Sequence, residues 1–223
     1  MDILKLAIDF VIHIDKYLDV ILKEYGILAY IILFLIIFAE TGLVVTPFLP
    51  GDSLLFEIGA ITARGELDLI IILFLLTFAA ILGDTVNYRV GAIFKDRLLR
   101  GESIRFIKDS HIERTKEFYN DYGGKTIIIG RFIPIIRTFA PFVAGIGNMK
   151  YRQFLFYNII GGVIWISIFT IAGYYFGNLP MIRKNFTLVI FAIIILSILP
   201  AVFEFLRSKI NKNNIIKDPS EGI

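Results

Sequence analysis

Long stretches without charged residues are the feature that most constrains the fold of this chain. Residues 153–182 contain no Asp, Glu, Lys or Arg over 30 positions, and residues 185–203 contain none over 19. Residues 25–39 and 69–83 form two further charge-free runs of 15 positions each. A helix needs about 20 mostly apolar residues to cross a hydrocarbon core about 30 Å thick. The longer runs meet this length alone and the shorter ones meet it with their neighbours, so we expect an integral membrane protein.

The composition agrees with this expectation and argues against other classes. Hydrophobic residues fill 57% of the 223 positions, whereas soluble domains usually have about 45–50%. The absence of cysteine excludes disulfides and thiolate metal sites, and no metal or cofactor is expected. A net charge of +3 is too small to indicate nucleic-acid binding. No signal peptide is predicted, because Asp2, Lys5 and Asp9 interrupt any early apolar core.

The topology follows from the apolar runs and the basic loops. Residues 26–206 are interpreted as one transmembrane domain, with spanning helices near residues 26–39, 67–87, 154–177 and 185–206. The loop at residues 89–125 is the most basic and is therefore expected in the cytoplasm. Both termini then lie in the cytoplasm, with residues 207–223 as a tail. Residues 1–25 have the pattern of an amphipathic helix, either at the membrane interface or packed on the protein.

Two apolar segments contain breaks that a straight spanning helix does not tolerate. Residues 41–64 include Pro47 and Pro50, and residues 125–148 include Pro134 and Pro141. Proline removes a backbone donor, and broken backbone at membrane depth persists only inside protein or beside a wet cavity. We interpret both segments as re-entrant hairpins that enter from opposite sides, a pattern typical of secondary transporters. The expected fold is an all-α polytopic membrane protein, with about four spans, two opposed hairpins and the N-terminal amphipathic helix.

Four ionisable residues in or beside these broken segments are the candidate site: Glu40, Asp52, Arg131 and Arg137. A charge at the bilayer centre costs roughly 2.5–3.5 kcal/mol, so four unpaired charges would cost on the order of 10 kcal/mol. They must therefore be paired, hydrated or functional. One interpretation is an internal salt-bridge cluster with no other role.

The functional interpretation gives each pair its own task. A guanidinium stays protonated and matches phosphate oxygens, so Arg131 and Arg137 are candidates for binding a substrate phosphate. Glu40 and Asp52 are candidates for proton coupling, because burial and a nearby arginine act in opposite directions on a carboxyl group. Asp84 and Asn87 are second-tier candidates, with a helix end meeting water as the alternative.

Two further residues, Trp165 and Glu57, receive structural interpretations. Trp165 is interpreted as a packing residue or an interface anchor. Glu57 is interpreted as an anchor near a helix end whose carboxylate reaches the interface.

Five ordered motifs follow Glu40 along the chain: PFLPGD (47–52), GDTVNYRVG (83–91), GRFIPIIRTFAPFVAGIGNM (130–149), NIIGGVIW (158–165) and GYYFG (173–177). Together they resemble the DedA family, which is related to the SNARE-associated Golgi, or VTT, domain. The resemblance implies a multi-pass bacterial inner-membrane protein with two opposed re-entrant hairpins. It also implies membrane homeostasis, recycling of undecaprenyl phosphate to the cytoplasmic leaflet and dependence on the proton gradient. The family's important acids and arginines fall on Glu40, Asp52, Arg131 and Arg137.

A proton-coupled carrier of an anionic lipid, with no enzymatic activity, is the first hypothesis. An ion-coupled exporter of cations or small solutes and a passive lipid scramblase are the alternatives. A membrane phosphatase or serine protease is disfavoured, because His13 and His111 lie outside the membrane segments and Ser53 has no histidine partner there. The expected partner is a membrane lipid, a polyprenyl phosphate or a phospholipid; the oligomeric state stays open.

Overall fold

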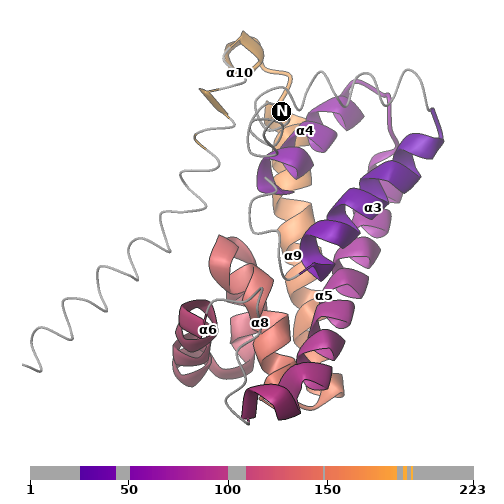
Figure 1. The fold of residues 1–223 in the computed structure, drawn as a ribbon. Helices are drawn as coiled ribbons and strands as arrows, with labels where there is room; N and C mark the ends of the chain where they lie inside the picture. The colour runs from indigo at the N-terminus through magenta and orange to yellow at the C-terminus, as the bar shows by residue number, and fades with distance from the viewer. Residues whose placement is uncertain are drawn as a thin grey trace, which may run out of the picture.

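The computed structural model describes residues 26–43, 51–99, 109–147 and 149–184, with residues 188, 189 and 192. The regular structure in these ranges is helical (Figure 1). The elements are α3 (Leu28–Gly42), α4 (Gly51–Ala63), α5 (Leu69–Leu99), α6 (Asp109–Tyr122), η1 (Gly123–Lys125), α7 (Thr126–Ile129), η2 (Gly130–Phe132), α8 (Pro134–Ile146), α9 (Tyr151–Phe176) and α10 (Pro180–Lys184). The expected helix at 1–25, the tail at 207–223 and nearly all of the span at 185–206 lie outside the described residues.

Two long antiparallel helices, α5 and α9, run the length of the molecule (Figure 1). The Asn158 side chain donates to the Ile81 carbonyl at 3.1 Å, and the rings of Tyr88 and Phe154 stack with their centroids 4.5 Å apart. Within the described chain, Leu69–Lys95 and Tyr151–Phe176 are the two helices long and apolar enough to cross a membrane.

The first broken element consists of α3 and α4. The Asp68 amide donates to the Tyr30 hydroxyl at 2.8 Å, and Gly42 lies against Gly83, so α3 runs parallel to α5. Asp52 contacts Trp165, and the Asn178 side chain donates to the Ala60 carbonyl, so α4 runs parallel to α9. The segment expected as a span at 26–39 forms a 15-residue helix that ends at Gly42, and residues 51–63 of the expected hairpin at 41–64 form α4.

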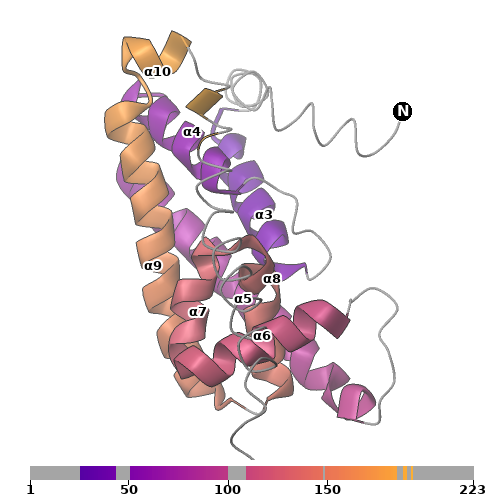
Figure 2. The same cartoon turned by 90° about the vertical axis from the view of Figure 1, so that its left-hand side faces the viewer.

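The second broken element lies within the expected segment 125–148. The chain rises through α7 and η2, becomes extended at Ile133 (φ −121°, ψ 108°) and returns through α8. Pro134 explains the break, because a residue before proline is pushed out of the helical region and proline itself is well accommodated at the first helical position. Figures 1 and 2 place α3 and α4 in one half of the molecule and α6, α7 and α8 in the other.

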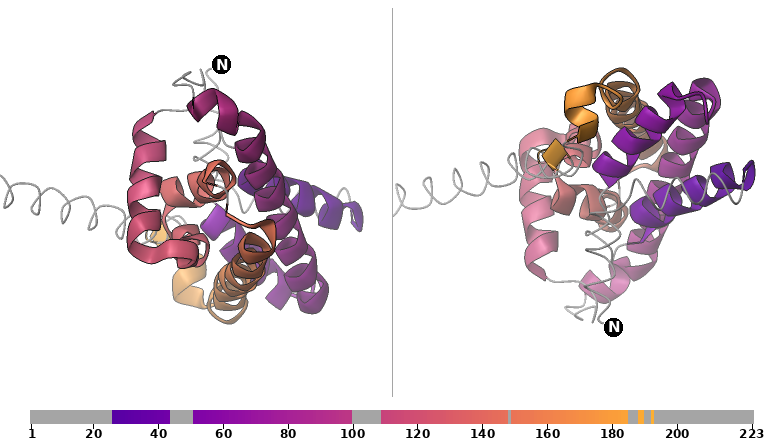
Figure 3. Two further views of the ribbon diagram at one scale, coloured as in Figure 1. Left: turned by 90° about the horizontal axis from the view of Figure 1, so that it is seen from below. Right: turned by 90° about the horizontal axis from the view of Figure 1, so that it is seen from above.

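The surface helix α6 covers α8. Seen along the long axis in Figure 3, α8 lies between α6 and α5. The Tyr119 hydroxyl on α6 donates to the Ala140 carbonyl on α8 at 2.9 Å. Burial, with a smaller contribution from the charge of Asp84, raises the pKa of Tyr119, so this hydroxyl stays protonated and remains a donor.

Backbone contact between α4 and α9 depends on glycine. A Cβ at Gly173 would overlap the Phe56 carbonyl, and a Cβ at Gly59 would overlap the Thr170 carbonyl. Small residues at such positions let helix backbones approach closely in membrane proteins. The packing of α4 on α9 matters for the site, because α4 carries Asp52 and α9 carries Trp165.

Replacing Gly173 with alanine should lower thermal stability, since the added methyl group forces α4 away from α9. Overpacking of this kind costs about 1–3 kcal/mol. The check is the thermal unfolding midpoint of the purified protein in detergent, followed by far-UV circular dichroism. Val163→Ala is the matched control, because this α9 side chain is exposed. An unchanged midpoint for Gly173→Ala would contradict the close helix packing.

Candidate functional site

The end of α3 and the first turns of α4 and α8 meet in a buried ion-pair cluster. The Arg137 guanidinium, in the first turns of α8, donates to Glu40 at 2.6 Å and to Asp52 at 2.9 Å. Glu40 lies near the end of α3, and Asp52 lies in the first turn of α4. Glu40 is 4% exposed, Asp52 8%, and the Arg137 side chain 10%. Three of the four residues expected at the site are thus joined directly, from both halves of the chain.

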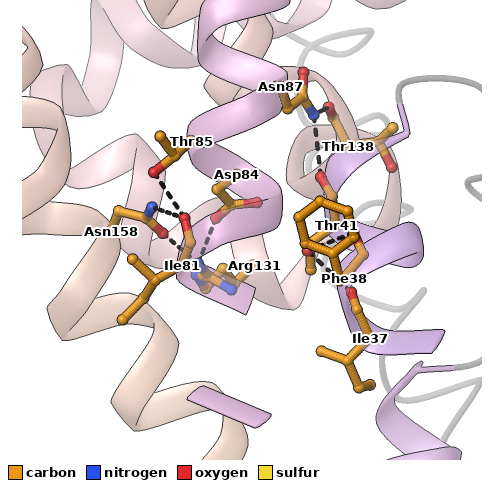
Figure 4. A network of polar contacts seen from close by, with 10 residues as sticks. All are labelled: Ile37, Phe38, Thr41, Ile81, Asp84, Thr85, Asn87, Arg131, Thr138 and Asn158. Carbon is orange, nitrogen blue, oxygen red and sulfur yellow. Dashed lines mark hydrogen bonds and ion pairs between the residues drawn. The ribbon is translucent and has the colours of Figure 1, made fainter. Parts of the chain in front are cut away.

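The fourth residue, Arg131, lies in a second buried pair. Its Nη2 donates to the Asp84 carboxylate and to the Asn158 side-chain oxygen (Figure 4). Arg131 and Asp84 are each 2% exposed. The alternative that Asp84 marks a helix end in water is wrong, because α5 continues to Leu99 and the Asp84 side chain is buried. Asp84 is therefore the counter-ion of Arg131 and belongs to the cluster.

Asn87, the other second-tier candidate, connects helices instead of binding a charge. Its side-chain amide donates to the Thr41 carbonyl at 3.3 Å and to the Thr138 carbonyl at 2.8 Å. Figure 4 shows it reaching these two carbonyls, away from Arg131. These bonds join α3, α5 and α8 next to the cluster, which indicates a role in holding these three helices together.

Trp165 joins the two ion-pair groups, and the sequence interpretation as packing residue or anchor missed this. Its indole N–H donates to Asp52 Oδ1 at 2.9 Å. The ring centroid lies 5.0 Å from the Arg137 guanidinium carbon and 5.7 Å from that of Arg131, within cation–π range. The side chain is completely buried. Trp165 and Asn158 are thus site residues on α9 that carry no charge.

Glu57 is the residue that the sequence interpretation placed at the interface as an anchor. That interpretation is wrong, because Glu57 is 3% exposed on α4, where every residue from Gly51 to Thr62 is buried. Glu57 lies farther along α4 than Asp52, away from the hairpin tip.

The cluster has unused hydrogen-bonding capacity and an unequal number of charges. Nε and Nη1 of Arg131 and Oε2 of Glu40 are buried without a hydrogen-bond partner. The cluster combines three carboxylates (Glu40, Asp52, Asp84) with two guanidinium groups. The N-termini of α4 and α8 also lie here, and helix N-termini favour anions. The arrangement can bind an anion on Arg131 and exchange protons on its carboxylates.

Comparisons with known proteins agree over most of the chain. The VTT domain matches residues 49–175. Protein DedA of Escherichia coli (strain K12) is 50% identical over 211 residues, which cover 94% of this chain and 96% of that protein. An uncharacterized membrane protein of Mycobacterium tuberculosis (strain H37Rv) is 39% identical over 175 residues, 78% of this chain and 77% of its own. The inner membrane protein YqjA of E. coli (strain K12) is 34% identical over 155 residues, 70% of each chain. No solved structure matches.

Proposed function

This chain belongs to the DedA family of VTT-domain membrane proteins, and we propose that it carries an anionic lipid across the inner membrane, with undecaprenyl phosphate as its substrate. In this proposal α5 and α9 span the bilayer, and α3–α4 and α7–α8 are re-entrant hairpins from opposite sides. The basic segment at 89–125 supports an orientation in which this segment and both termini face the cytoplasm.

The observation that carries the proposal is the pairing of Arg137 with Glu40 and Asp52 where the hairpin tips meet. The charges of the full cluster sum to −1 when all five groups are ionised, because three carboxylates face two guanidinium groups. A phosphate would add one or two negative charges, and excess buried charge is strongly unfavourable. Substrate binding therefore requires proton uptake, which Glu40 and Asp52 are placed to provide.

Proton uptake also makes a guanidinium available. Once Glu40 or Asp52 is protonated, Arg137 loses an ionic partner and can donate to a phosphate oxygen instead. When the phosphate leaves, the carboxyl group releases its proton and pairs with Arg137 again. The entry of the proton down its gradient drives the phosphate in the same direction, because each phosphate is carried with a proton.

The alternative of an ion-coupled cation exporter explains the carboxylates but gives the arginines only a structural role. The two buried donors of Arg131 without partners favour an anion. A purely structural salt bridge would use these donors, since an unmade hydrogen bond at a buried group costs about 1–3 kcal/mol. The passive scramblase shares the binding site and differs in lacking coupling.

The deciding experiment uses purified full-length protein in liposomes with labelled undecaprenyl phosphate in one leaflet. An external phosphatase reports the fraction of phosphate groups that face outward. Transport should accelerate when a proton gradient is imposed and slow when an ionophore collapses it. Equal rates under both conditions would favour the scramblase, and no movement of the lipid would overturn the carrier proposal.

A further inference from the structure

One oxygen of Asp52 is held by two N–H donors. Asp52 Oδ1 accepts hydrogen bonds from Arg137 Nη1 and from Trp165 Nε1, both at 2.9 Å. The two donors come from different helices, α8 and α9, and converge on one acceptor. Hydrogen bonds from N–H donors to an ionised oxygen are strong, and phosphate offers the same kind of oxygen as carboxylate.

Trp165 is fixed in a position to serve such a role. An indole N–H that is buried needs an acceptor, and Asp52 is the one present. The ring also lies close to both guanidinium groups. Trp165 is the only tryptophan in the chain, so its fluorescence reports on this site alone.

We propose that Asp52 occupies the phosphate position in the substrate-free protein, and that the Trp165 indole N–H becomes a third phosphate donor, beside Arg131 and Arg137, when Asp52 withdraws. This inference rests on the proposed function and adds a specificity-determining residue to it. The exchange conserves hydrogen bonds, because the phosphate oxygen takes over the two donors that Asp52 releases. The substrate class it fits is a phosphate monoester on a lipid, whose oxygens replace the carboxylate.

Four other charged groups share the cluster with Asp52. The charged groups of the cluster around Asp52 are Glu40 on α3, Asp84 on α5, Arg131 on η2 and Arg137 on α8. Asp84 is held by Arg131, which leaves Glu40 and Asp52 to share Arg137. When Asp52 withdraws, its negative charge no longer competes with phosphate for these donors.

The test measures equilibrium binding of farnesyl phosphate, a short lipid phosphate, to the full-length protein in detergent by titration calorimetry. Trp165→Phe keeps an aromatic ring but removes the N–H, and should weaken binding about tenfold while leaving farnesol binding unchanged. Asp52→Asn removes the competing charge and should tighten binding about tenfold. In the wild type, farnesyl phosphate but not farnesol should change the Trp165 fluorescence.

Phe154→Leu is the matched control, because it also reduces a fully buried aromatic residue on α9 but lies against Tyr88, away from the cluster. It should bind farnesyl phosphate as the wild type does. A wild type that binds farnesyl phosphate no better than farnesol would overturn the proposed function itself. Normal wild-type binding with an unchanged Trp165→Phe, or with weaker binding in Asp52→Asn, would overturn only this inference.

Discussion

Replacing Arg137 with glutamine is expected to abolish lipid transport and to destabilise the protein strongly. The substitution leaves Glu40 and Asp52 buried near each other without the cation that now bridges them. Removing one partner of a buried ion pair costs about 3–5 kcal/mol, because an uncompensated charge remains. The measurements are transport in proteoliposomes and the thermal midpoint in detergent, followed by gel filtration after heating.

Two further variants separate charge balance from function. Arg64→Gln is the matched control for loss of an arginine, because its pair with Glu66 is more exposed, at 23% and 38%, and such pairs contribute about 0–1 kcal/mol. The double variant Arg137→Gln with Glu40→Gln should regain part of the lost stability, since only one carboxylate then lacks its cation. It should still not transport. Transport by either Arg137 variant would contradict the role of this guanidinium in substrate binding.

The grouping of Glu40, Asp52 and Arg137 could be predicted from the sequence, because charges in apolar broken segments need partners. The partner of Arg131 could not. The sequence becomes polar from Arg89 onward, which suggested that the helix ends near Asn87. The helix continues to Leu99, so Asp84 lies in its middle and faces Arg131. A loss of hydropathy marks where a helix leaves an apolar environment and not where the helix ends.

The uncharged site residues could not be identified by the absence of charge, the criterion that identifies the membrane segments. Residues 153–182 are predicted to span the membrane because they lack charge, and this criterion does not distinguish Asn158 and Trp165 from their neighbours. A signal was nevertheless present. A buried side-chain amide or indole N–H in an apolar helix needs a hydrogen-bond partner, and here the partners are the cluster's own charged groups.

The break in the second apolar segment could be predicted from proline, whereas the end of the first helix could not. Pro134 places the second break at Ile133, as its effect on the preceding residue predicts. The first helix ends later than its apolar run suggests, because α3 continues past Glu40 to Gly42. An acid at the end of an apolar run suggests a boundary, yet Glu40 lies inside the helix, where it is buried and pairs with Arg137.

A double-mutant cycle on Arg131 and Asp84 is expected to separate stability from transport. Arg131→Gln and Asp84→Asn should each cost about 3–5 kcal/mol, because each leaves the other charge buried and unpaired. The double variant should be markedly more stable than the sum of the two single changes predicts, since neutral amides can hydrogen-bond to each other and to Asn158. Contacting residues commonly show coupling energies of about 0.5–3 kcal/mol in such cycles. Thermal midpoints of the four proteins give the coupling.

Transport in the same four proteins shows what the charge of Arg131 does. If its two unpartnered donors bind phosphate, the double variant should regain stability without regaining transport, because a neutral amide cannot replace a guanidinium against a phosphate. Asp84→Asn alone should retain some transport, since it keeps both arginines. Recovery of transport together with stability in the double variant would mean that Arg131 and Asp84 form only a structural pair. The phosphate would then have to bind without Arg131, at the Arg137 end of the cluster.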